Sequence, residues 1–142
     1  MKIIEVFNEE GQADSFMVSN IIIDKVHLLH RVKIGGQFDW KRPYHDQKEV
    51  DTFYNESSTT KYISYYVNED DVVFVIFGSN FNHNDVDDII TKCFYKNNLP
   101  STVRSAGFVT SDWCCYGKSY TLKINSLEED SDILRRQVEG EK

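Results

Sequence analysis

The spacing of apolar and polar residues along the chain predicts short strands interrupted by amphipathic helices. Apolar and β-branched residues gather in short runs of a length that is typical of strands. These runs predict strands at 2–7, 17–26, 61–67, 72–77, 102–109 and 119–124. The polar segment 68–71 joins two of them and predicts a hairpin. We expect residues 37–44 to be irregular, because two glycines precede them and Pro43 restricts the residue before it.

Three other segments have the spacing of helices. In 45–55, three apolar residues fall on one face. Segment 85–97 carries a longer apolar stripe, with aspartates in its first turn and lysines near its end, as the helix dipole favours. The members of that stripe are Val86, Ile89, Ile90, Cys93 and Phe94. Ser126 and Glu129 match a capping box, which predicts a short helix near the C-terminus.

This order of elements, β-β-α-β-β-α-β-β-α, predicts one α/β domain of the α+β-like kind over residues 1–142. We expect a mixed sheet of about six strands, because a hairpin and a β-α-β step would share it. Two main helices would pack on this sheet, and residues 126–142 would form a short C-terminal helix or tail. A chain of 142 residues fits a single hydrophobic core.

Composition and charge narrow the class of protein. Hydrophobic residues make up 40% of the chain, which is enough for a packed core. No apolar run is long enough to span a membrane and the N-terminus lacks a secretory signal, so we expect a cytoplasmic protein. The abundance of Asn, Lys, Ile and Tyr is typical of a low-GC genome such as that of a phage, which would place the protein in the host cytoplasm. The net charge of −7 argues against binding to a nucleic-acid backbone.

The cysteines and the acidic cluster near the second helix do not predict a metal site. Cys93, Cys114 and Cys115 are odd in number, which fits a reducing compartment, and no second pair completes a zinc site. Residues 82–88 hold asparagines and aspartates, but they lack the glycine and the closing glutamate of a calcium-binding loop. We therefore expect neither a metal nor another cofactor.

Segment 77–84 joins a predicted strand to a predicted helix, and backbone N–H groups at such junctions bind anions. Gly78 permits close approach to the backbone, but the following aspartates oppose an anion and the P-loop spacing is absent. From these residues alone, a structural role is the favoured interpretation. His83 and Asn84 resemble a His-Asn nuclease motif, which the acidic charge and the lack of zinc ligands disfavour. His45, at the start of a predicted helix, is a candidate general base.

Taken in order, four pieces of the chain resemble the Janus family, whose known members include phosphohistidine phosphatases. The pieces are residues 18–27, Trp40 with Tyr44 and His45, residues 75–80, and Leu99 with Pro100 after a helix. Together they extend over residues 18–109, most of the chain. The fold that this resemblance implies is a mixed sheet with two flanking helices.

The function that the resemblance implies is a metal-independent phosphohydrolase or a phosphate-binding protein. It gives His45 the role of a general base that activates water. It assigns phosphate binding to four residues, Gly78, Ser79, Asn80 and Phe81. Asn20 stands where the family's basic residue is expected, so Arg42 or Lys41 would have to supply the charge. The partner would be a phosphorylated small molecule or a phosphorylated protein.

Two other classes of function stay open. The absent basic residue and the acidic charge fit a relative that keeps the fold without the activity, and that binds or regulates an unidentified protein partner. An acidic mimic of nucleic acid is a third reading. It would need long acidic stripes, whereas the acidic residues are scattered along this chain.

Overall fold

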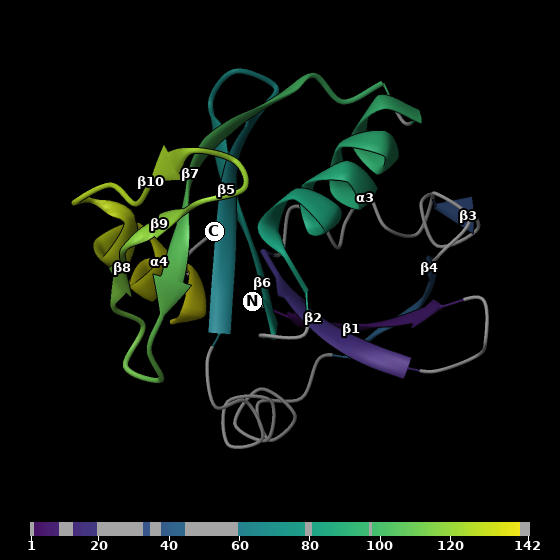
Figure 1. The fold of residues 1–142 in the computed structure, drawn as a ribbon, viewed down its shortest axis with the longest axis horizontal. Coiled ribbons are helices and arrows are strands. Elements are labelled where there is room, and N and C mark those ends of the chain that lie inside the picture. The colour runs from purple at the N-terminus through teal and green to yellow at the C-terminus, as the bar shows by residue number, and fades with distance from the viewer. Residues whose placement is uncertain are drawn as a thin grey trace.

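A computed structural model describes residues 2–8, 13–19, 33–34, 38–44, 60–78, 81–96 and 98–139 of the chain (Figure 1). The strands in this part are β1 (Lys2–Asn8), β2 (Ala13–Val18), β3 (Lys33–Ile34), β4 (Phe38–Tyr44), β5 (Thr60–Val67), β6 (Asp71–Gly78), β7 (Ser101–Val109), β8 (Cys115–Tyr116), β9 (Lys118–Ser119) and β10 (Ile124–Asn125). The helices are α3 (His83–Lys96) and α4 (Asp130–Val138). The predicted helix at 45–55 and residues 20–26 of the predicted strand at 17–26 lie outside the described residues.

Eight of these strands form one sheet in the order β3-β4-β1-β2-β6-β5-β7-β8, and β9 and β10 form a separate hairpin. The α+β class is therefore confirmed, but the prediction of a mixed sheet is wrong for the described strands. Every neighbouring pair in the sheet is antiparallel. The strands β6 and β7 do run parallel, as the α3 crossover between them requires, yet β5 lies between them and pairs with both. The β-α-β step therefore creates no parallel pair.

The prediction that residues 37–44 are irregular is wrong, because β4 pairs along its length with β1. Pro43 lies opposite Ile4, close to a shift in register between Ile4 and Val6. On the other side of β4, the described chain pairs only Phe38 and Asp39, through β3. A proline cannot donate to a ladder, but it is tolerated where one side of the strand has no partner. Among the described residues β3 does not extend as far as Pro43, so no pairing described on that side of β4 uses the N–H that Pro43 lacks.

The predicted strand at 119–124 is also wrong, because the chain turns back on itself there. The turn between β9 and β10 is closed by the backbone N–H of Leu122, which donates to Ser119 Oγ at 3.1 Å. Lys123 adopts a left-handed conformation, with φ of 58°. Alternating apolar and polar residues fit both arrangements, and the serine side chain favours the turn.

The predicted capping box of Ser126 and Glu129 does not form. Helix α4 begins at Asp130, whose carboxylate accepts a hydrogen bond from the backbone N–H of Leu127 at 2.9 Å. Glu129 makes no side-chain cap and lies instead 3.1 Å from Arg104. The start of this helix is thus determined by a tertiary contact in addition to local sequence. At the other helix, α3 begins two residues before the predicted start, and three members of the predicted apolar stripe, Val86, Ile90 and Phe94, are buried in the core.

The core has two parts, one on each face of the sheet. Alternate residues of β6 divide between them: Val73, Val75 and Phe77 pack with α3, and Phe74 and Ile76 pack with α4. Figure 1 shows α3 and α4 on opposite sides of the central strands. Because both faces are covered, the central strands are apolar at consecutive positions. Neither helix in the described part of the chain is long and apolar enough to cross a membrane.

Candidate functional site

The turn between β6 and α3, which the Janus resemblance assigns to phosphate binding, opens onto free space. A Cβ added to Gly78 would meet no heavy atom within 4 Å. The backbone N–H of Phe81 donates to the carbonyl of Gly78 at 3.3 Å, which closes the turn. Ser79 and Asn80 lie outside the described residues. Gly78 therefore has open space on its Cβ side, which by the alternation of side chains along β6 is the face opposite to that of Phe77.

A small hollow of about 140 Å³ lies beside this turn. It has room for roughly four or five water-sized groups, which is the scale of a single phosphate. Side chains from β5, the start of α3, β7 and the β9–β10 hairpin line it. They are Lys61, Asn82, His83, Phe108, Lys118, Tyr120 and Thr121.

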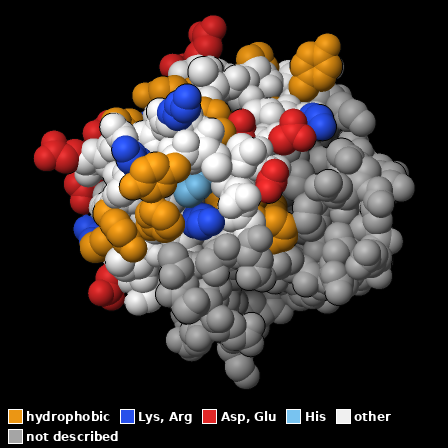
Figure 2. All heavy atoms as spheres, viewed as in Figure 1, with side chains coloured by type: hydrophobic (Ala, Val, Ile, Leu, Met, Phe, Trp, Pro, Cys, Tyr) orange, Lys and Arg blue, Asp and Glu red, His pale blue; other side chains and the backbone are white. Residues whose placement is uncertain are grey.

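Two lysines bring positive charge to the hollow. Lys61 is half-buried on β5, and its ammonium donates to the carbonyl of Phe81 at 2.8 Å. Lys118 is exposed on β9, and its Nζ lies 4.8 Å from the centre of the Tyr120 ring. Figure 2 shows lysine or arginine and hydrophobic side chains gathered around a histidine on this face. In a chain of net charge −7, this pair forms a local site that attracts an anion.

His83 forms one wall of the hollow and is only 4% exposed. Its Nε2 donates to the carbonyl of Gly107 at 2.8 Å, since a carbonyl can only accept. The rings of Phe77 and Phe108 pack against it edge-on, with centroids at 5.5 and 5.9 Å. Burial, together with the nearby charge of Lys61, lowers the pKa of His83 below its ordinary value. A neutral imidazole therefore borders the hollow near neutral pH, with its unprotonated nitrogen at Nδ1.

The aspartates at the start of α3 oppose an anion less than the sequence suggests. Asp87 accepts a hydrogen bond from the hydroxyl of Tyr65 at 2.9 Å, and burial raises the pKa of its carboxyl. Asp88 pairs with Lys92 at 2.9 Å. Two of the three carboxylates are thus engaged with groups away from the hollow, and Asp85 remains exposed in the first turn.

The structure brings some of the predicted site residues together and leaves others apart. Phe81 lies next to the hollow through its carbonyl, which accepts from Lys61, whereas Gly78 is not among the residues that line the hollow. Arg42 lies on β4, which is four strands away from β5 in the sheet order. Neighbouring strands are about 4.8 Å apart, so its backbone is roughly 19 Å from β5. The side chain of Arg42 and all of His45 lie outside the described residues, so the general base stays a prediction.

Sequence reasoning missed both lysines of the hollow. Lys61 is a charged residue within an apolar strand, which is a weak signal that it has a partner. Lys118 lies in a polar segment and carries no signal at all. Their proximity follows from the pairing of β5 with β7 and the return of the chain through β9.

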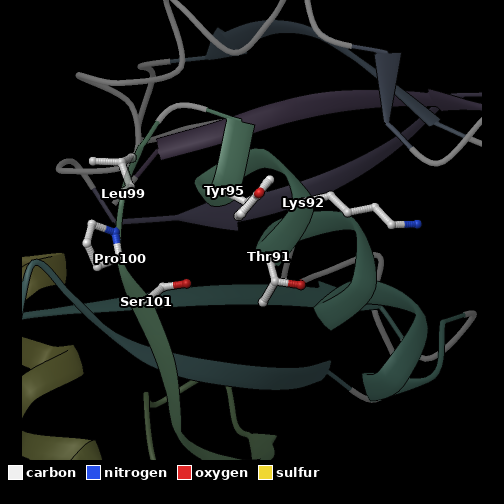
Figure 3. Close-up of a pocket in the computed structure, with 6 residues that line it drawn as sticks. All are labelled: Thr91, Lys92, Tyr95, Leu99, Pro100 and Ser101. Atoms are coloured by element: carbon white, nitrogen blue, oxygen red, sulfur yellow. The ribbon is translucent and has the colours of Figure 1, made fainter.

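A second hollow, of about 520 Å³, lies between α3 and the start of β7. Figure 3 shows Tyr95 beside Leu99 and Pro100, while Lys92 extends away from them. Tyr95 is 84% exposed. This hollow is larger than the first, and its one lysine, Lys92, is paired with Asp88 at 2.9 Å.

Two of the three cysteines, Cys114 and Cys115, have described side chains, and both are free thiols. No cluster of three or more metal-ligating side chains occurs in the described part of the chain. Burial, with the charge of Asp130, raises the pKa of the Cys115 thiol to about 12, so it stays protonated near neutral pH. The Cys114 sulfur accepts a hydrogen bond from Arg135 at 2.8 Å. The lysine-lined hollow is therefore the strongest candidate site.

Comparison of the chain with family models, with curated proteins and with solved structures found no match.

Proposed function

We propose that this domain binds a phosphorylated ligand in the hollow between Lys61 and Lys118. The observation that carries this proposal is the convergence of two lysines on a space the size of one phosphate. Hydrogen bonds between ammonium groups and phosphate oxygens are charge-assisted and therefore stronger than neutral ones. Asn82 and Thr121 add neutral donors at the same walls.

The position of the hollow gives a second line of support. It adjoins the turn whose ends are Gly78 and Phe81, which the Janus resemblance assigns to phosphate binding. That resemblance lacked a basic residue, because Asn20 stands at the expected position. Lys61 supplies a cation at the same turn, since its ammonium is 2.8 Å from the carbonyl of Phe81. The positive charge required for phosphate binding thus comes from β5, and not from the predicted strand at 17–26 that contains Asn20.

Binding of inorganic phosphate tests the proposal directly. We expect saturable binding by isothermal titration calorimetry, and a loss of affinity of roughly tenfold in both Lys61→Gln and Lys118→Gln, because each variant removes a hydrogen bond to a charged group. Lys123→Gln is the matched control, since this exposed residue belongs to the same hairpin but does not line the hollow. Equal affinities in Lys118→Gln and Lys123→Gln, or no binding by the natural sequence, would overturn the proposal.

Hydrolysis is a separate step and needs a separate test. His83 is a poor general base at Nε2, because that nitrogen already donates to Gly107. The base implied by the resemblance is His45, so we expect His45→Ala to abolish hydrolysis of phosphohistidine and of an aryl phosphate while phosphate binding persists. Release of inorganic phosphate over time measures both reactions. Equal rates in the natural sequence and the variant would show that His45 is not catalytic.

A further inference from the structure

A row of aromatic rings runs from the core to the mouth of the lysine-lined hollow. Phe77 is fully buried, and His83 packs against it edge-on. Phe108 follows at 5.9 Å from His83, and Tyr116 at 5.7 Å from Phe108. Tyr116, the outer end of the row, is 52% exposed. The wall formed by His83 and Phe108 therefore continues outward as an aromatic surface.

Tyr120 extends this aromatic surface on the hairpin side of the hollow. Its side chain is 77% exposed and lines the hollow itself. Among the residues whose side-chain exposure is described, five large hydrophobic side chains are exposed; of these, Tyr120 lines the hollow and Tyr116 stacks on its lining residue Phe108. An exposed aromatic ring next to a charged pocket offers a flat surface on which a planar group can stack.

The hollow is large enough for the phosphate of a ligand but not for the group attached to that phosphate. Pockets that enclose a whole drug-sized ligand measure about 300–1,000 Å³, whereas this one measures about 140 Å³. A phosphate fits inside, so the group attached to it must lie over the rim. Tyr120 lines the hollow itself, and Tyr116 stacks on the lining residue Phe108, with their planes 30° apart. A planar ring is the group that such a rim holds best, because it stacks on flat faces.

We infer that the ligand is a small phosphate ester that carries a planar aromatic ring, with the phosphate between Lys61 and Lys118 and the ring over Tyr116 and Tyr120. This inference rests on the proposed phosphate site and names its ligand class. A nucleotide and a phosphorylated phenol share this chemistry. A long nucleic acid does not fit the net charge of −7, since its many phosphates need an extended basic surface.

Four probes separate the ring from the phosphate: adenosine monophosphate, phenyl phosphate, glycerol phosphate and inorganic phosphate. We expect at least one of the two aromatic esters to bind roughly tenfold more tightly than glycerol phosphate, because stacking of a base on an aromatic side chain has about this effect. Whichever aromatic ester binds more tightly identifies the source of the ring, a nucleobase or a phenol.

Substitution of the two tyrosines tests whether they cause the preference for an aromatic ester over glycerol phosphate. Tyr116→Leu and Tyr120→Leu should each lower the ratio of aromatic to glycerol phosphate affinity toward one. Tyr95→Leu is the matched control, since this exposed tyrosine lies on α3 at the other hollow and should leave the ratio unchanged.

The possible failures are distinguishable. If all four probes bind with similar affinity, or if Tyr95→Leu changes the ratio as much as Tyr120→Leu does, the ring inference is wrong and the phosphate site stands. If none of the four probes binds, the proposed function and the ring inference both fail.

Discussion

His83 illustrates how packing determines the chemistry of a single residue. In the unfolded chain its imidazole titrates at the ordinary pKa of 6.5, but burial and Lys61 lower this pKa in the folded state. The Nε2 donor is held by Gly107, and two phenylalanine rings fix the plane of the imidazole. The residue therefore acts as a neutral wall of the hollow and does not add a third positive charge.

The lowered pKa of His83 predicts a loss of stability in acid. As pH falls below 6.5, the unfolded chain takes up a proton that the folded imidazole refuses, so the free energy of unfolding decreases until the folded pKa is reached. Above pH 6.5 this contribution is constant. We expect the natural sequence to lose more stability between pH 7.5 and pH 5.5, by at most about 1.4 kcal/mol, than His83→Gln, which has no titrating group at this position.

Urea unfolding of both proteins at the two pH values measures this difference. Asp87, whose raised pKa has the opposite sign of effect, is present in both proteins and cancels in the comparison. An identical pH dependence in the two proteins would contradict the assignment.

At the scale of elements, a buried ion pair holds α4 against the sheet. Arg104 on β7 contacts Asp130 at the start of α4, and their side chains are 3% and 0% exposed. The hydroxyl of Tyr62, on β5, donates to the same carboxylate at 2.5 Å. One carboxylate thus connects the helix to two strands and also accepts from the backbone of Leu127. The packing of α4 on the sheet therefore depends on the pair of Arg104 and Asp130.

Breaking the buried pair should be far more costly than breaking an exposed one. We expect Arg104→Met to reduce the free energy of unfolding by about 3–5 kcal/mol, because it leaves Asp130 buried without its cation. Lys92→Met is the matched control, since it removes the cation of the exposed pair with Asp88 and should cost less than about 0.5 kcal/mol. Urea unfolding followed by circular dichroism measures both values. Similar losses in the two variants would mean that burial of the pair has no energetic effect.

At the scale of the whole molecule, the candidate site belongs to no single element. Strand β5 supplies Lys61, the start of α3 supplies His83, β7 supplies Phe108 and the hairpin supplies Lys118. The sheet and the elements that cover it position these side chains. The two lysines bring positive charge together on a chain whose net charge is negative. The two cores on either side of the sheet give this arrangement a rigid base.

The sequence by itself determined the elements whose signals are local. The strands at 61–67, 72–77 and 102–109, the turn between the first two and the helix α3 were predicted from spacing alone and are confirmed. These elements form the centre of the molecule, where strands buried on both faces need apolar residues at consecutive positions. Period and composition along a short stretch are sufficient to identify them.

Four features were decided only by the tertiary structure. They are the antiparallel pairing of the strands, the strand at Phe38–Tyr44, the turn after Ser119 and the start of α4. Each depends on a partner distant in sequence: β5 between β6 and β7, β1 beside Pro43, and Arg104 beside Asp130. The hollow has the same origin, since Lys61 and Lys118 have no relation along the chain. Spacing reports the face on which a side chain lies, whereas pairing energies between distant segments determine which faces meet.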